Sequence, residues 1–449
     1  MDYIVCILII LVFVWGAISN KKRILLYAYI ILSPYVLLIK FGLNPNSIFL
    51  SIWQNIYLIV LTTIAFALAV PYHKKLNNKF DFDIMSIFFF ANIIYGLIVA
   101  SITLINGNDL IIAVKGFRDY YLIMLFYFCV IYFITEEKIE PLIRVMLYTA
   151  LFNVVFTIIE AIYINYFSGI ENLFWLNQQY LNTENAEGDY VQGIPIITSE
   201  INFRYIRPFG VIMQPQINSI FLLFTLTLLY IDRRVFLWTN AKVAVAKCLA
   251  VIALLISFGK TAIIIYFIIL PLLYNFRRGV VYITIFILVF GIIALPFVYN
   301  IAIMFDLDSA YSLSGLLDLQ IYTENNTLFT FLAGSGFEEY DSIKTAREVT
   351  FFRLLHYFGI FGLIIYILPF AYLLYMFLQK KNQLNNENRS ICKVMLIIML
   401  IYWLSTMHYN AFWTNGINTY YILAIFVCHR AMQSGLMKRD NPALSSRLD

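Results

Sequence analysis

The sequence contains few charged residues. Only 13% of its 449 residues are Asp, Glu, Lys or Arg, whereas soluble domains carry about 25%. Hydrophobic residues make up 62% of the chain. They are gathered in runs as long as the roughly 20 residues that one helix needs to cross a bilayer. The low charge excludes an ordinary soluble protein, and the runs predict an all-α, polytopic transmembrane protein.

Cysteine and histidine are also scarce, with five and four residues. No C-x-x-C motif occurs, no two His have ligand spacing, and every Cys lies in or at the end of an apolar run. These patterns give little support to a disulfide framework or a zinc site. The pair Asp306 and Asp308 resembles the D-x-D metal motif of some sugar transferases, but three residues are weak support for a metal role.

A strong charge imbalance is absent too. The net charge is +5, and the basic residues cluster at the ends of apolar runs, so we expect no nucleic-acid partner. The first apolar run starts at Tyr3 without a basic segment before it or a small-residue cleavage site after it. We therefore expect no cleavable signal peptide.

The apolar runs predict about thirteen membrane spans. Their approximate ranges are 3–18, 24–40, 47–70, 83–105, 120–134, 141–164, 216–231, 242–258, 260–275, 279–298, 351–378, 391–407 and 417–430.

The orientation follows from Lys and Arg in the loops. Alternate loops hold most of the 31 basic residues, and such loops face the cytoplasm. The C-terminus is then cytoplasmic, and two long loops face outward. The predicted segments are an N-terminal transmembrane bundle at 1–164, a first outer loop at 165–215, central transmembrane helices at 216–298, a second outer loop at 299–350, C-terminal transmembrane helices at 351–431 and a cytoplasmic tail at 432–449.

Four arginines depart from this charge distribution. Arg204, Arg207, Arg347 and Arg353 lie near the outer boundary, where the two long loops return to apolar runs. They could be simple interfacial anchors whose side chains reach to water. An anionic ligand at headgroup height also explains them. A lipid diphosphate fits, because the planar guanidinium binds phosphate with two parallel hydrogen bonds.

Four short motifs follow one another over residues 200–365. The first is R-x-x-G-x(4)-P, at Arg207, Gly210 and Pro215, and the second is S-x-x-[RK]-[ST], at Ser257, Lys260 and Thr261. The third is the Gly-rich "LAGSGF" at 332–337, and the fourth is the re-entry segment "EVTFFRLLHYFGIFGLI" at 348–364. In order and spacing, the chain resembles the O-antigen polymerase and O-antigen ligase superfamily. The spans before residue 200 match it only in hydropathy.

The resemblance implies a GT-C-like fold in the bacterial inner membrane, with both long loops and the active site facing the periplasm. It implies an enzyme that polymerises undecaprenyl-diphosphate-linked repeat units by glycosyl transfer to a sugar hydroxyl. The glycosyl diphosphate already holds the bond energy, so we expect no cofactor and no metal. The implied partners are the lipid-linked oligosaccharide, membrane lipid and a separate chain-length regulator protein.

The predicted site combines cations and an acid. Cations stabilise the charge that grows on the leaving diphosphate, and a carboxylate removes the proton of the attacking hydroxyl. The predicted catalytic residues are Arg207, Arg347 and Glu348, with Glu338 or Glu339 as weaker bases. The predicted diphosphate-binding residues are Arg204, Arg353 and Lys260, and the structural motif residues are Gly210 and Pro215. A single displacement would invert the anomeric configuration.

Two alternatives stay open. An O-antigen ligase typically opens its re-entry segment with His-Asn, whereas Glu348 and Val349 occupy that position here, although His356 and His408 are nearby. A flippase for lipid-linked sugars could use the same arginines without chemistry. A flippase should line a central path with charge from both sides, but Glu160 is the clearest intramembrane acid.

Overall fold

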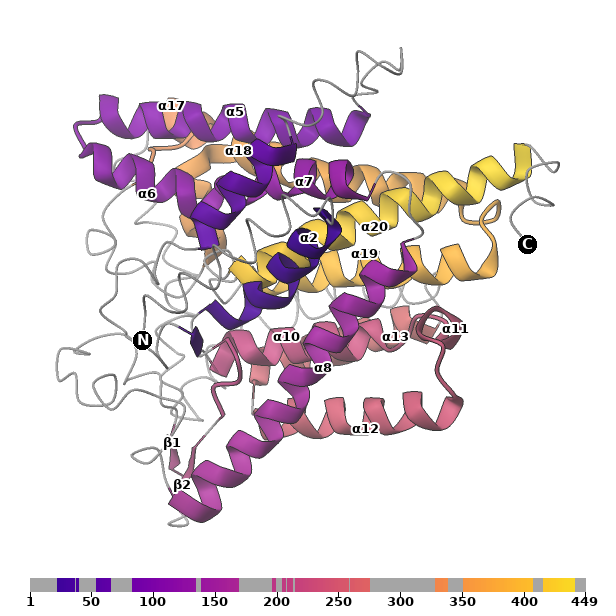
Figure 1. The fold of residues 1–449 in the computed structure, drawn as a ribbon. Helices are drawn as coiled ribbons and strands as arrows, with labels where there is room; N and C mark the ends of the chain where they lie inside the picture. The colour runs from indigo at the N-terminus through magenta and orange to yellow at the C-terminus, as the bar shows by residue number, and fades with distance from the viewer. Residues whose placement is uncertain are drawn as a thin grey trace, which may run out of the picture.

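The structure is a computed structural model, shown in Figure 1. It describes residues 22–36, 38–39, 54–65, 83–134, 139–168, 196–198, 204–206, 208–212, 215–257, 259–274, 328–337, 350–406 and 415–440, some of them by their backbone only. The labelled elements are α2 (Lys22–Leu32), η1 (Ser33–Tyr35), α5 (Ile84–Ile105), α6 (Leu110–Tyr120), η2 (Leu122–Met124), α7 (Leu125–Phe133), α8 (Glu140–Ile162), η3 (Tyr163–Ser168), β1 (Ile196–Thr198), β2 (Arg204–Ile206), α10 (Pro215–Leu228), α11 (Arg233–Phe236), α12 (Asn240–Ile256), α13 (Lys260–Tyr274), α17 (Leu328–Ala333), α18 (Thr350–Lys380), α19 (Asn386–Thr406) and α20 (Asn415–Asp440).

Several helices are long and apolar enough to cross a membrane. Among the described residues these are Ile84–Ile105, Leu110–Phe133, Glu140–Phe167, Leu354–Lys380 and Asn386–Thr406. Four apolar helices are shorter: Arg23–Tyr35, Gln54–Ala65, Gln216–Leu228 and Thr261–Leu273. The prediction of a helical chain with helices long and apolar enough to span a membrane is thus confirmed. The count of about thirteen spans stays a prediction, and the spans expected at 3–18 and 279–298 lie outside the described residues.

The helices run back and forth between two ends of the molecule. The α5–α6 connection, the β1–β2 hairpin and the start of α10 lie at the left end in Figure 1. The α10–α11 and α18–α19 connections and the end of α20 lie at the right end. Loop charge predicts the same grouping, with the left end outward and the right end cytoplasmic.

One span begins earlier than predicted. We expected it at 120–134, but helix α6 already starts at Leu110 and continues through η2 into α7. The buried residues of α6 are Ala113, Gly116 and Tyr120, a spacing that places them on one helical face. Ile111 on the other face is 78% exposed. Lys115 and the Arg118–Asp119 pair lower the mean hydropathy of this segment, so the apolar runs did not predict the helix.

A short hairpin interrupts the helical pattern. Strands β1 and β2 pair antiparallel, with Ile196 opposite Ile206 and Thr198 opposite Arg204. The hairpin lies in the first predicted outer loop, for which the sequence predicted no strand. It places the backbone of Arg204 at the start of β2, shortly before the chain enters α10.

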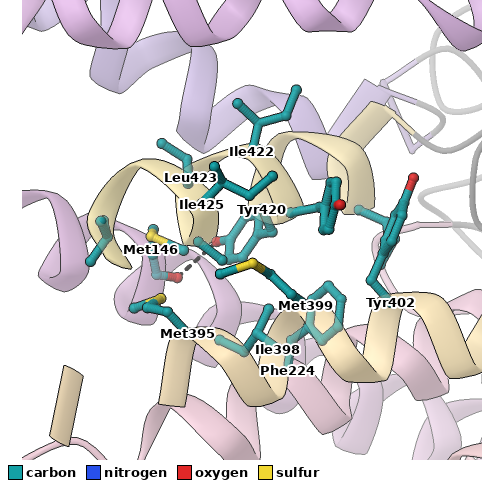
Figure 2. Packing of buried hydrophobic residues seen from close by; sticks show 14 of the residues in the cluster. Met146, Phe224, Met395, Ile398, Met399, Tyr402, Tyr420, Ile422, Leu423 and Ile425 are labelled. Atoms are coloured by element: carbon teal, nitrogen blue, oxygen red, sulfur yellow. Dashed lines mark hydrogen bonds between the residues drawn. The ribbon is translucent and has the colours of Figure 1, made fainter. Parts of the chain in front are cut away.

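The core centres on the antiparallel helices α19 and α20. Figure 2 shows their side chains packed against Met146 of α8 and Phe224 of α10. The hydroxyl of Tyr420 donates to the carbonyl oxygen of Met146 at 2.7 Å, and the ring of Tyr402 stacks on that of Tyr421 at 4.1 Å. These contacts fix α8 and α10 against the centre of the bundle.

Candidate functional site

The three predicted catalytic residues lie outside the part of the chain that the structure describes. Outside the described residues lie Arg207, Arg347, Glu348, Glu338, Glu339, His408, Asp306 and Asp308. The backbones of Arg204, Lys260 and Arg353 lie in β2, α13 and α18, and their side chains are outside the described part of the chain. The site is therefore built from the motif glycines and the residues that they contact.

The first cluster of polar residues lies where the chain enters α10. We name Asn153, Thr157, Glu160, Gly210 and Asn218 the first re-entry cluster. The three α8 members are spaced i, i+4 and i+7 and so share one helical face; each is fully buried, as is Asn218. The backbone N–H of Gly210 donates to Glu160 Oε2 at 2.6 Å. Asn153 Nδ2 donates to Asn218 Oδ1 at 2.8 Å, and Asn218 Nδ2 donates to Thr157 Oγ1 at 3.2 Å.

The cluster explains why this turn has a glycine and a proline. Gly210 has φ 63°, which disfavours other residues, and a Cβ there would overlap the side chain of Asn218. The next N–H, of Val211, donates to Asn153 Oδ1 at 3.0 Å. Pro215 is the first residue of α10, a position where the absent N–H costs nothing. Gly210 and Pro215 thus shape the chain just after Arg207.

The second sequence motif meets the same turn of α10. A Cβ on Gly259 would overlap the side chain of Ser219, so the start of α13 touches α10 closely. Ser219 directly follows Asn218, which contacts Gly210. Ser257 caps the end of α12 by donating to the carbonyl oxygen of Leu254 at 2.7 Å. The R-x-x-G-x(4)-P and S-x-x-K motifs therefore converge on two consecutive residues of α10.

A broken helix forms the second cluster. We name Tyr95, the turn 334–337 and residues 356–359 the second re-entry cluster. Helix α18 is interrupted at Gly359, which has φ 63° and ψ −177°. This conformation is almost restricted to glycine. The N–H of Ser335 donates to the carbonyl oxygen of His356 at 2.8 Å, and that of Gly336 donates to the carbonyl oxygen of Tyr357 at 3.3 Å.

Helix α5 holds both parts of this cluster. The hydroxyl of Tyr95 contacts the carbonyl oxygen of Phe358 at 2.7 Å and that of Ala333 at 3.0 Å. Asn106 Nδ2 donates to the carbonyl oxygen of Ser335 at 2.7 Å. The N–H of Phe337 donates to Thr103 Oγ1 at 2.7 Å. The LAGSGF turn and the re-entry segment, predicted only as separate motifs, are therefore in direct contact.

Aromatic rings pack around the second cluster. The ring of Phe337 stacks on Tyr120 with 5.9 Å between ring centres, and Phe358 meets Tyr120 edge-on at 5.2 Å. A Cβ on Gly116 of α6 would overlap the Phe337 ring. Because these rings exclude water, the backbone hydrogen bonds at the break lie in a medium of low dielectric, where they are stronger.

Both clusters lie at the same end of the molecule. The second is bonded to Thr103 and Asn106 at the α5–α6 connection, and the first lies at the start of α10. Figure 1 places this connection, the hairpin and the start of α10 at one end of the bundle. This is the end that the sequence predicts to face outward.

Sequence reasoning missed the partners of the motif glycines. Glu160 was noted as an intramembrane acid, but Asn153, Thr157, Asn218 and Tyr95 were not predicted. The signal was present for α8, because polar residues at i, i+4 and i+7 of an apolar helix point to one buried face. The role of Tyr95 had no signal, because a lone Tyr in an apolar run resembles any core aromatic.

Among the described residues no three His, Cys, Asp or Glu side chains are placed to hold a metal ion. No known family model matches the sequence, and no curated protein matches it significantly. The likeness to O-antigen polymerases and ligases therefore rests on the four motifs.

Proposed function

We propose that the chain is a polymerase of lipid-linked polysaccharide, a glycosyltransferase with a GT-C-like helical fold and about thirteen spans. It transfers a growing chain from undecaprenyl diphosphate to a sugar hydroxyl of a new repeat unit, at the periplasmic face of a bacterial inner membrane. One observation carries the proposal: the four motifs form two pairs, one at Gly210 and one at Gly359, at the same end of the bundle. Chain length is set by a separate partner protein.

Binding of the lipid diphosphate uses the cations near the two re-entry points. Helix α10 starts just after the first cluster, and the second half of α18 starts at Gly359. The N-terminal end of a helix favours a nearby anion. Arg207 and Arg204 precede α10 in the sequence, and Arg347 and Arg353 precede Gly359. Their guanidinium groups, with Lys260 as a weaker contributor, bind the diphosphate.

The chemistry is a single displacement at the anomeric carbon. The bond between this carbon and the diphosphate oxygen breaks as the acceptor hydroxyl oxygen forms the new bond. Negative charge grows on the leaving oxygen, so pre-placed arginines stabilise the transition state more than the ground state. Glu348 takes the proton of the acceptor hydroxyl, and the product has inverted configuration. Neither metal nor nucleotide takes part.

The test uses the purified full chain in proteoliposomes with synthetic lipid-diphosphate-linked repeat units. We expect Arg207→Ala to slow polymerisation about 100-fold or more, and Glu348→Gln to slow it at least about 100-fold. The matched controls are Arg234→Ala and Glu387→Gln, which make the same changes at the opposite end of the bundle. Near-normal polymerisation by both site variants, at equal protein levels, contradicts the assignment.

Deletion phenotypes separate the alternatives. A strain without a polymerase still caps its lipid A-core with single repeat units. A strain without a flippase adds none, and a strain without a ligase accumulates polymer on the lipid carrier. A banding gel of lipopolysaccharide distinguishes these three outcomes.

A further inference from the structure

A pocket of about 370 Å³ lies at the end of the molecule opposite the re-entry clusters. It is a shallow, open pocket formed by the residues that follow α10, by α11 and by the first turns of α12. Its walls include Leu229 and Val243 on the apolar side, with Tyr230, Arg233, Asn240 and Lys247 on the polar side. Ligand pockets span about 300–1,000 Å³, so there is room for a phosphate group with its substituents.

The pocket is positively charged. Among the described residues, neither Arg233 nor Lys247 forms an ion pair. Asp232, next to Arg233 in the sequence, is bonded to Arg234, with Arg234 Nη2 at 3.0 Å from Asp232 Oδ2. The ammonium of Lys247 lies 3.6 Å from the centre of the Tyr230 ring. This contact holds one cation at the pocket wall, and the first turn of α12 adds the positive end of its dipole.

A strip of apolar surface leads away from the pocket along α12. Ala244 lines the pocket and is exposed, and residues 248, 251 and 255 follow it at i+4, i+7 and i+11 on one helical side. They are an exposed Cys, a half-buried Val and a Leu that is 54% exposed. A ligand with both a phosphate and a hydrocarbon chain fits this layout, because the strip covers the chain while the cations bind the phosphate.

We propose that this pocket binds the phosphate of an anionic membrane lipid at the predicted cytoplasmic end, with an acyl chain along the strip from Ala244 to Leu255. A phosphate anion free in solution shares the headgroup chemistry but has no hydrocarbon chain to contact the strip. The site is independent of the proposed glycosyl transfer, which takes place at the other end of the bundle.

The test is native mass spectrometry of the full chain in a neutral detergent, titrated separately with phosphatidylglycerol, phosphatidylcholine and inorganic phosphate. Arg233→Gln and Lys247→Gln each remove one cation from the pocket. Lys242→Gln is the matched control, because Lys242 lies on the same helix, is exposed and does not line the pocket. Lys247→Arg retains the charge, and Arg233→Gln carries the test if Lys247→Gln folds poorly.

We expect phosphatidylglycerol to bind more tightly than phosphatidylcholine. Each pocket substitution should weaken phosphatidylglycerol binding about fivefold, and the double variant should remove the preference. Lys242→Gln and Lys247→Arg should stay within about twofold of the unaltered chain. Equal losses in the control and pocket variants, or no lipid preference in the unaltered chain, overturn the site. Full competition by millimolar inorganic phosphate overturns the lipid assignment.

Discussion

The two re-entry clusters satisfy the buried backbone groups of a turn with different hydrogen-bond partners. Each must satisfy backbone groups where the chain turns inside an apolar environment, because an unsatisfied buried group costs several kcal/mol. In the first cluster the side chains of Glu160 and Asn153 accept the N–H groups of Gly210 and Val211. In the second, carbonyl groups of the broken helix accept from the turn 334–337 and from Tyr95.

The difference has a consequence for mutation. The first cluster depends on side-chain chemistry, so it is sensitive to substitutions that remove an acceptor oxygen. The second depends on close backbone contact, so an added Cβ at Gly334 or Gly359 would overlap main-chain atoms, whereas one at Gly210 would overlap the side chain of Asn218. One end of the molecule thus contains a turn held by a carboxylate and amides, beside a turn held by backbone geometry.

The largest effect should come from Gly359→Ala. Its φ and ψ are almost restricted to glycine, and the new Cβ would overlap the carbonyl oxygen of Leu332 and the N–H of Gly334. We expect a loss of at least about 4 kcal/mol in the free energy of unfolding. Denaturation by SDS in mixed micelles, followed by circular dichroism, measures this loss.

Gly107→Ala is the control for Gly359→Ala. Gly107 also has positive φ, at 83°, but nothing lies within 4 Å of a Cβ there. Only the backbone preference is lost, at a cost of about 1 kcal/mol. If both variants are equally stable, the close contact between the turn and the broken helix is not a source of stability.

The second largest effect should come from Glu160→Ala. This change leaves the buried N–H of Gly210 without its acceptor and opens a cavity, so we expect a loss of about 3 kcal/mol in unfolding free energy. Glu160→Gln keeps one acceptor oxygen and nearly the same volume, and should lose about 1 kcal/mol. The same denaturation assay compares the two. Equal losses would mean that the carboxylate charge, and not the acceptor oxygen, holds the turn.

The sequence predicted the elements better than their contacts. Composition and apolar runs predicted the helical class, and α5, α8, α12 and α19 begin within a few residues of the predicted spans. Helix α6 was missed because Lys115 and Arg118 lower the hydropathy of a half-exposed helix. The hairpin was missed because a few residues per strand give no periodic signal.

The site could be predicted only in part for a related reason. Motif spacing identified Gly210 and the LAGSGF turn, since turns require particular residues at particular places. It could not show that residues 334–337 bond to residues 356–357, because that contact is set by packing on Tyr95 and Thr103. The roles of Arg207, Arg347 and Glu348 stay predictions.

A smaller effect in the second cluster should come from Tyr95→Phe. The ring remains and only the hydroxyl, with its contacts to Ala333 and Phe358, is lost. We expect a loss of about 1–2 kcal/mol in unfolding free energy. Tyr375→Phe is the control, because that ring is 58% exposed and its hydroxyl bonds only a neighbouring Gln379 among the described residues. A Tyr95→Phe variant no less stable than the control would show that the turn and the broken helix hold each other without the Tyr95 hydroxyl.

The smallest effect should lie at the opposite end, at Asp232. The backbone N–H of Arg234 holds the pKa of the Asp232 carboxyl below its usual range. A lowered pKa stabilises the fold above the pKa of the unfolded chain, and this contribution is lost as pH falls through the folded pKa. Asp232 caps only a four-residue helix, so Asp232→Ala should cost about 0.5 kcal/mol. The difference in unfolding free energy from the unaltered chain should be constant from about pH 7 to pH 5 and shrink below about pH 4. A difference that grows on acidification would contradict the cap. Asp232→Asn keeps the acceptor oxygen, so it should show little loss of unfolding free energy and little pH dependence of that loss.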